Sequence, residues 1–261
     1  MKFCVLASGS QGNATYVEGG GVRLLIDAGL SCRALEQRLA AVGVSPDGLD
    51  GILVTHEHVD HVKGLSRFCE RYGVPVYANE GTAAVVERQC RLEKKRVPEW
   101  AIFESSVPFV LGELVVQSIR ISHDTAEPVA FTLTGERGKL GYFTDLGVAS
   151  RMVASALGGC TALVLESNHD LEMLRHSGRP YSLIARIQGA SGHLSNDQAG
   201  ELLAQACPET LRRLVLAHLS RDCNEPAVAR VGAERVLRAI DRADVPVMVA
   251  RQDEALEMME V

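Results

Sequence analysis

Three histidines and an aspartate stand within six positions of this chain, directly after a short apolar run. The segment reads Thr55-His56-Glu57-His58-Val59-Asp60-His61 and follows Ile52-Leu53-Val54. Imidazole and carboxylate groups together suit zinc, manganese or iron, and an open coordination position on such an ion lets water ionise near neutral pH. This density of ligands favours two neighbouring metal ions over one, and a solvated histidine-rich turn is the alternative.

The spacing inside this cluster indicates how its side chains are arranged. His56 and His58 are two residues apart, so on an extended backbone they point the same way. Asp60 and His61 are expected in the turn that follows. The sequence therefore predicts a strand that runs straight into a metal site.

Three more apolar segments end on a residue that can bind metal. They run into His123, Asp145 and His218. In layered α/β proteins such residues gather where loops converge over the ends of a rigid sheet. Each one alone also has a plainer explanation, because a histidine at a strand end commonly makes only structural hydrogen bonds, and Asp145 can cap a helix that begins near Ala149.

Composition limits the classes of protein to consider. A chain of 261 residues with 46% hydrophobic content can bury one sizeable core, so a single domain over residues 1–261 is expected. The net charge of -6 gives no global attraction to nucleic acid or to an acidic membrane surface, so a polyanion would need a local cationic patch. Seven scattered cysteines without a CxxC pair are typical of reduced thiols, and no apolar stretch is long enough to span a membrane. We expect a soluble, cytoplasmic protein that makes no membrane contact, and the sequence leaves its oligomeric state unknown.

Short runs rich in valine, isoleucine and leucine alternate with helix-like segments along the whole chain, which predicts a layered α/β fold. Strands are expected over residues 2–7, 14–18, 23–27, 51–55, 74–78, 114–122, 129–134, 140–144, 162–166, 213–217 and 245–250. Helices are expected over residues 33–42, 62–72, 149–157, 181–188, 196–206 and 226–240. The charged stretch 87–99 is expected to be a loop or the end of a surface helix.

In this chain order the candidate ligands resemble the metallo-β-lactamase fold superfamily, whose pattern is Asp, HxHxDH, His, Asp, His. The resemblance covers essentially the whole chain and implies a four-layer αββα sandwich with two divalent metal ions, Mn or Zn. It also implies that Asp27 orients the cluster without binding metal. The implied ligands are His56, His58 and His123 for one ion, Asp60, His61 and His218 for the other, and Asp145 as the bridge between them.

Two accessory motifs point to one branch of that superfamily. They are Leu165-Glu166-Ser167-Asn168-His169-Asp170 and Ser191-Gly192-His193-Leu194-Ser195-Asn196. Both resemble motifs of the tRNase Z and RNase J nucleases, which implies that His193 protonates the leaving oxygen or holds a phosphate oxygen, with Glu166 orienting it. The alternative is structural, because Ser195 or Asn196 can cap the next helix and Glu166 can end a strand in a solvated ion pair.

The loop Ser8-Gly9-Ser10-Gln11-Gly12-Asn13 can present N–H groups and hydroxyls to an anion, although turn chemistry alone also explains its residues. Together with the motifs above, this loop resembles the YycJ (WalJ) family of single-domain nucleases, which implies 5′-to-3′ exonuclease activity on DNA. The catalytic candidates are then Asp60, Glu166 and His193. The candidates for binding substrate or phosphate are Ser8, Ser10, Asn13, His169, Arg175 and Arg179.

The expected function is therefore a dinuclear-metal phosphodiesterase acting on nucleic acid. One alternative is a thioester hydrolase of the glyoxalase II kind, which shares the ligand set and suits the acidic net charge but lacks a use for Glu166 and His193. Another is a scaffold without catalysis, against which the intact ligand set argues. Two groups of basic residues are candidates for contact with a nucleic acid backbone: Arg88, Arg91, Lys94, Lys95 and Arg96, and Arg175, Arg179 and Arg186.

Overall fold

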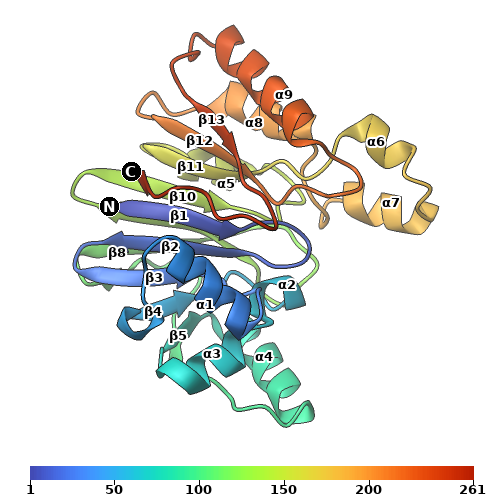
Figure 1. Cartoon of the computed structure of the whole chain (residues 1–261). Coiled ribbons are helices and arrows are strands. Elements are labelled where there is room, and N and C mark those ends of the chain that lie inside the picture. The colour runs from blue at the N-terminus through green and yellow to red at the C-terminus, as the bar shows by residue number, and fades with distance from the viewer.

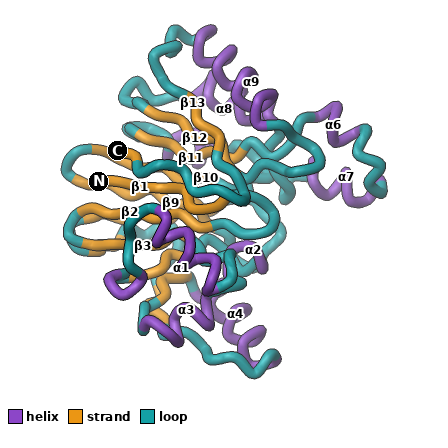
Figure 2. Tube along the Cα trace, viewed as in Figure 1, coloured by secondary structure: helices purple, strands orange, loops and turns teal.

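Two seven-stranded sheets lie face to face in the middle of the molecule, and helices cover the outer face of each sheet (Figures 1 and 2). The computed structural model describes all residues from 1 to 261. The arrangement confirms the αββα sandwich predicted from the sequence. No helix combines the length and the apolar character that crossing a membrane requires.

The N-terminal half of the chain and its last strand form the first sheet, in the order β14-β1-β2-β3-β4-β5-β6. Its strands are β1 (Lys2–Ala7), β2 (Ala14–Gly19), β3 (Val22–Ile26), β4 (Gly51–Leu53), β5 (Val76–Ala78), β6 (Trp100–Ile102) and β14 (Met259–Glu260). The helices α1 (Cys32–Ala41), α3 (Leu65–Tyr72) and α4 (Glu80–Leu92) pack on its outer face. The short helices η1 (Pro46–Gly48) and α2 (Val59–Val62) lie in the connections before and after β4.

The second sheet has the order β13-β12-β11-β10-β9-β8-β7. Its strands are β7 (Phe109–Leu111), β8 (Leu114–Arg120), β9 (Val129–Gly135), β10 (Gly138–Phe143), β11 (Ala162–Glu166), β12 (Arg213–Ala217) and β13 (Val247–Val249). Three helices cover its outer face, α5 (Arg151–Ala156), α8 (Asn196–Ala206) and α9 (Pro226–Ala239). Two others, α6 (Leu171–Arg175) and α7 (Tyr181–Gln188), project from the body of the molecule (Figure 1).

Burial on both faces explains why the central strands have continuous apolar sequences. In β11, Leu163 and Leu165 pack under the helices, whereas Ala162 and Val164 face the other sheet. A strand covered on only one side would alternate apolar and polar residues instead. The uninterrupted run therefore reflects a strand enclosed between two layers.

Several strands run in the same direction and bring their carboxyl ends to one edge. In the first sheet β3 and β4 are parallel, and in the second sheet β10, β11 and β12 are parallel. β1 is antiparallel to β2, and β2 is antiparallel to β3, so β1 and β3 run in the same direction. For the same reason β8 runs in the same direction as β10. Residues that follow these strands can therefore meet over one edge of the sandwich.

The structure differs from the sequence predictions mainly in short elements. Asp60 and His61 lie in the one-turn helix α2 rather than in a turn, and α4 begins well before the charged stretch 87–99. The strands β6, β7 and β14 and the helix α6 are not predicted by the sequence pattern. Asp145 does not cap α5, because the side chain of Ser150 accepts the N–H of Val153.

Candidate metal centre

The carboxyl ends of the strands bring the predicted metal ligands into one cluster. Four of its members follow β4, and the others follow or end β3, β8, β10, β11 and β12, except for one that precedes α8. The cluster comprises Asp27, His56, His58, Asp60, His61, His123, Asp145, Glu166, His193 and His218.

One part of the cluster holds His56, His58 and His123, whose ring nitrogens lie within 4.8 Å of one another. Nδ1 of His123 donates to the carbonyl oxygen of Gly192 at 3.1 Å, which leaves its Nε2 to face Nδ1 of His58 at 3.2 Å. Two imidazole nitrogens at this distance share one space. A hydrogen bond on one ring nitrogen that turns the other toward a common point is the usual arrangement of histidines that bind metal.

Asp60, His61 and His218 form a second group, and their ligand atoms also lie within 4.8 Å of one another. Nδ1 of His61 is 2.7 Å from Asp27, and Nδ1 of His218 is 2.9 Å from Glu166. Both rings therefore turn Nε2 toward Asp60, whose Oδ2 is 3.6 Å from His61 and 3.5 Å from His218.

Asp145 lies between the two groups. Its Oδ2 is 3.2 Å from Nε2 of His61, and its Oδ1 is 3.7 Å from Nε2 of His123 and 3.5 Å from Nδ1 of His218. The carboxylate thus touches residues of both groups, as a bridging ligand would.

The donor set fits divalent cations on two observations. Nε2 of His56, Nε2 of His218 and Oδ2 of Asp145 are buried without a hydrogen-bond partner. In addition, the ion-pair partners of the four clustered carboxylates are all histidines, with no lysine or arginine among them. Buried carboxylates need compensating positive charge, so this cluster is built to hold metal cations.

The pKa values of the ionisable groups reflect the same demand for positive charge. Burial lowers the pKa of His218, but the neighbouring Asp145, Asp60 and Glu166 outweigh it and raise that pKa to about 10. Burial raises the pKa of Asp145, but the nearby His218 and His61 hold it well below its usual value. The pKa of His56, in contrast, is lowered well below its usual value, chiefly by burial, which favours the neutral ring that a metal requires.

Glu166 is fully buried and accepts four hydrogen bonds. Its Oε1 is 2.9 Å from Nδ1 of His193 and 2.9 Å from Nδ1 of His218, and its Oε2 accepts the N–H groups of Leu146 at 2.8 Å and Leu194 at 3.0 Å. Burial raises the pKa of Glu166, but His193 and His218 more than offset this and lower it to about 2. The permanently charged carboxylate therefore fixes two imidazoles at once. His193 is 21% exposed, so part of its ring is open to solvent.

Three residues of the cluster adopt left-handed backbone conformations. Asp27, Asp145 and His218 have φ values of 62°, 58° and 56°. Each follows the end of a central strand, where the turn directs the side chain back over the sheet edge. Such conformations cost about 1 to 3 kcal/mol each in residues other than glycine, and they persist where surrounding bonds enforce them.

Buried residues of the N-terminal loop make hydrogen bonds to this cluster. The hydroxyl of Ser8 accepts the N–H of His218 at 2.7 Å, while Nδ2 of Asn13 lies 3.3 Å from Oδ2 of Asp60 and 3.0 Å from Nε2 of His61. Ser8 and Asn13 are both buried, whereas Ser10 is exposed. The polar atoms of Ser8 and Asn13 thus hold segments from both halves of the chain that carry clustered residues, and their binding of phosphate stays a prediction.

Thr55 is part of the centre although the sequence reasoning did not single it out. Its hydroxyl lies 3.0 and 2.9 Å from the two oxygens of Asp27, 3.0 Å from Nδ1 of His56 and 3.2 Å from Nδ1 of His61. Its position directly before His56 was the available signal. Asp124 was missed as well, and its Oδ1 is 3.5 Å from Nε2 of His58.

The remaining substrate-binding candidates lie beyond the ligands. His169 is 1% exposed and its Nε2 has no hydrogen-bond partner, and its contact with substrate stays a prediction. Arg175 lies on α6 and pairs with Glu172 at 2.5 Å, and Arg179 pairs with Asp222 at 2.9 Å. Arg175 is exposed and Arg179 is half-buried, and neither contacts a clustered residue. The basic residues 88–96 are on or after α4, which packs on the other sheet.

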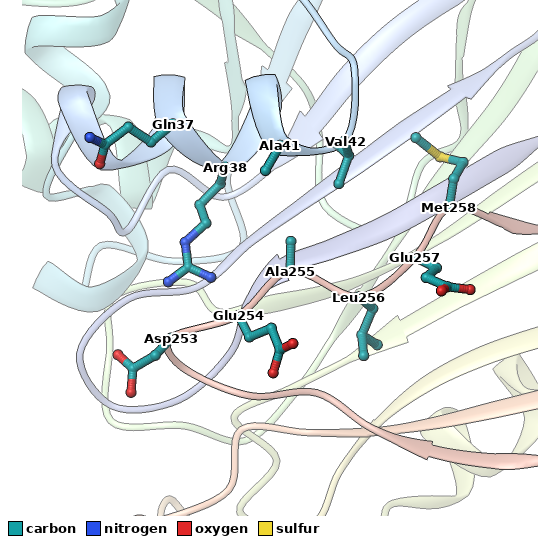
Figure 3. A pocket seen from close by; sticks show the side chains of 10 residues that line it. All are labelled: Gln37, Arg38, Ala41, Val42, Asp253, Glu254, Ala255, Leu256, Glu257 and Met258. Carbon is teal, nitrogen blue, oxygen red and sulfur yellow. The ribbon is translucent and has the colours of Figure 1, made fainter.

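A large hollow lies elsewhere, between α1 and the extended segment 253–258 (Figure 3). Its volume is about 680 Å³, and Arg38, Asp253, Glu254 and Glu257 are among the side chains that line it. None of the clustered ligands reaches it. The metal centre instead lies at the edge where the strands end.

Two facing sheets with a histidine and carboxylate cluster at their carboxyl edge define a metal-dependent hydrolase. Residues 22–219 match the family model described as beta-lactamase superfamily domain, and the chain belongs to this superfamily. The resemblance stated from the sequence is thereby confirmed.

Individual proteins of this superfamily are similar to the chain over most of its length. The chain is 39% identical over 239 residues to the protein named exodeoxyribonuclease YycJ of Bacillus anthracis, a match that covers 91% of this chain and 89% of the relative. It is 33% identical over 231 residues to exodeoxyribonuclease WalJ of Streptococcus pneumoniae, covering 88% of this chain and 86% of that protein. The crystal structure of the metallo-β-lactamase fold protein YhfI from Bacillus subtilis superimposes with a TM-score of 0.73 at 17% identity, covering 98% of this chain and 99% of that one.

Proposed function

We propose that this chain is a nuclease that hydrolyses phosphodiester bonds of DNA from a strand end, and that residues 1–261 act as one catalytic domain. Relatives that match about nine-tenths of the chain carry the name exodeoxyribonuclease, which supports this proposal. The fold and the ligand cluster supply the hydrolytic chemistry. The pair formed by Glu166 and His193 supplies the preference for a phosphodiester.

The observation that carries the proposal is the position of His193. Its Nδ1 is held by Glu166 at 2.9 Å, its ring centroid is 5.2 Å from those of His123 and His218, and it is partly exposed. Part of the imidazole is therefore open to solvent beside the clustered residues, and no hydrogen bond engages its Nε2. A departing alkoxide needs a proton, and a positioned imidazole is the common donor. A thiolate leaves readily without such help, so the glyoxalase II alternative gives this pair no task.

Under this proposal the centre holds two ions, manganese or zinc. The first would be held by His56, His58 and His123, the second by Asp60, His61 and His218, and Asp145 would contact both. When bound, such ions neutralise charge that develops on the phosphate and favour ionisation of water. The orientation of these ligands is the work of Asp27, Thr55 and Glu166, which fix the far nitrogen of His61, His56 and His218.

The chain's own groups then divide the proton transfers. Asp60 is 16% exposed at the carboxylate and borders the opening, so we assign it the proton of the attacking water. His193 gives its Nε2 proton to the leaving oxygen, and Glu166 keeps the imidazole in the orientation that this transfer requires. The two groups act from different elements, Asp60 from α2 and His193 from the loop before α8.

Cationic side chains near the opening are the proposed contacts to the nucleic acid backbone. Arg175 ends α6, Arg179 lies in the connection between α6 and α7, and Ser10 is the one exposed hydroxyl of the N-terminal loop. Both arginines are in ion pairs at the surface, and such pairs contribute little stability, so a phosphate can replace the carboxylate partner.

Purified protein loaded with Mn²⁺ or Zn²⁺ and offered labelled single-stranded DNA, duplex DNA, RNA and S-lactoylglutathione tests this function. We expect stepwise shortening of DNA strands and no turnover of the thioester. Turnover of the thioester alone would refute the nuclease and favour the glyoxalase II kind of hydrolase. Turnover of none of these compounds with either metal would favour a scaffold.

A further inference from the structure

We propose that the arm formed by α6 and α7, residues 171–188, binds single-stranded nucleic acid, and that Tyr181 stacks on one of its bases. This inference rests on the proposed nuclease function. It narrows the substrate to strands whose bases are unpaired close to the cleaved bond.

Tyr181 is placed where an aromatic ring has no structural use. It is 85% exposed, more than any other large hydrophobic side chain of the molecule, and it is the only aromatic residue among the exposed ones. It is the first residue of α7, on the part of the molecule that projects from the sandwich in Figure 1. A ring held in water at such a position is available to a ligand with a flat apolar face.

The arm around this ring is rich in arginine in an acidic protein, although Arg179 and Arg186 each pair with an aspartate outside the arm. Between residues 171 and 188 it carries Arg175, Arg179 and Arg186 against the single acidic residue Glu172, whereas the whole chain has a net charge of -6. An aromatic ring among arginines matches nucleic acid, in which flat bases alternate with phosphates. A purely apolar partner surface would have no use for the arginines.

Two contacts fix the inner end of the arm to the metal centre. Nε of Arg186 donates to Oδ2 of Asp124 at 2.7 Å, and Oδ1 of Asp124 is 3.5 Å from Nε2 of His58. The backbone N–H of His193 donates to the carbonyl oxygen of Ile187 at 2.9 Å. The helix α7 therefore begins at Tyr181 in solvent and ends beside the proposed general acid.

The length of this helix sets the distance between the stacked base and the cleaved bond. Ile187 is six positions after Tyr181, which corresponds to about 9 Å along the helix axis. Stacked nucleotides rise about 3.4 Å each. Tyr181 is thus placed to contact a base about two to four nucleotides from the bond that is cleaved.

Apolar packing holds the arm in place, so the ring is presented on a rigid support. Leu174 of α6 and Ile187 of α7 are buried against Cys223, with Leu183 and Ile184 packed on this small core. Tyr181 is not part of this small core and stands exposed at the start of α7. A preorganised ring loses little freedom when a base stacks on it, which favours binding.

The test measures binding with the full-length chain in EDTA, where the strands stay intact. Fluorescence anisotropy of a labelled twelve-nucleotide DNA would be compared for the wild type, Tyr181→Ala, Tyr181→Phe and Leu92→Ala. Leu92 is 77% exposed at the end of α4 and serves as the matched apolar control. We expect Tyr181→Ala to weaken binding about tenfold, because stacking on one base has an effect of this size. Tyr181→Phe and Leu92→Ala should stay within about twofold of the wild type.

Two further strands separate stacking from charge. A strand of equal length without bases should bind Tyr181→Ala and the wild type equally, and 2-aminopurine near the bound end should lose fluorescence only with proteins that keep the ring. Equal binding of the normal strand by Tyr181→Ala and wild type would overturn the inference and leave the ring to a protein partner. If the wild type binds no strand in EDTA and also cleaves none with Mn²⁺ or Zn²⁺, the proposed nuclease function itself fails.

Discussion

The metal centre and the projecting arm differ in how far their charged side chains are buried and in how firmly those side chains are held. In the centre, the carboxylates of Asp27, Asp145 and Glu166 are almost fully buried, and their partners are histidines a few ångströms away. On the arm, Arg175 and Glu172 are each more than half exposed, and their ion pair lies open to water. The first region keeps its geometry through many enforced contacts, whereas the second can exchange its partners.

This difference separates two tasks that a nuclease must combine. Chemistry at a phosphodiester needs donors fixed to within fractions of an ångström, which buried and fully bonded side chains provide. Moving along a strand needs contacts that form and break easily, which exposed arginines and one ring provide. Substitutions in the centre should therefore change metal content or turnover, whereas substitutions in the arm should change DNA binding.

The largest effect is expected at Asp145, which touches both groups of ligands. Asp145→Ala should lower the metal content of the purified chain and reduce turnover by more than about a hundredfold. Replacing a residue that only orients a metal ligand already lowers metal affinity or activity by about 10- to 100-fold. Elemental analysis and DNA cleavage measure the two effects. Two metals retained per chain would contradict the bridging role, and Asp145→Asn, which keeps the side-chain shape, controls for a folding defect.

His193→Ala should affect the reaction without affecting the metals. We expect unchanged metal content and turnover of DNA lowered about a hundredfold or more, the usual contribution of a general acid. A phosphodiester with p-nitrophenolate as its leaving group needs no proton, so its hydrolysis should fall much less. Equal losses on both substrates would assign His193 to substrate binding or structure instead.

Within the N-terminal loop, one buried and one exposed residue give a matched pair. Asn13→Ala should weaken metal binding about tenfold, because the amide of Asn13 holds Asp60 and lies against His61. Ser10→Ala should leave metal affinity as it was, since its side chain is at the surface. Metal titration of both variants decides, and equal affinities would mean that the loop only fills space.

The smallest effect is expected from the arginines of the arm. Arg175→Ala combined with Arg179→Ala should weaken DNA binding several-fold and reduce its dependence on salt, by about one unit of slope for each phosphate that the protein no longer neutralises. Arg88→Ala combined with Arg96→Ala removes the same charge from the region of α4 and should change neither quantity. A larger effect of the second pair would indicate that DNA binds near α4 rather than at the arm.

Sequence reasoning located the residues that the structure brings into one cluster, because apolar strands run directly into them. The residues from His56 to His61, together with His123, Asp145 and His218, each mark the end of a buried run, and their order along the chain is typical of one superfamily. The long central strands and most helices are predictable for the same reason, since hydrophobic runs of this kind leave few alternative folds.

The sequence did not reveal which polar residues are buried. Ser8 and Asn13 look like an exposed turn because glycine, serine and asparagine favour turns, yet contacts from distant segments enclose them. The strands β6, β7 and β14 have two or three residues each, too few for a periodic pattern. The helix α4 is only partly recognisable because its charged C-terminal half obscures the buried Thr82 and Val86 of its first turns.

The left-handed backbone at Asp27, Asp145 and His218 also restricts which amino acids evolution can use there. Aspartate, asparagine and histidine tolerate this conformation several-fold better than most residues, and glycine has no polar side chain to offer. Glutamate or a β-branched residue would need to distort the turn in order to place its polar atoms at the same points of the cluster. At these three positions the shape of the chain, together with the polar contacts of the cluster, therefore selects the short carboxylate and the imidazole.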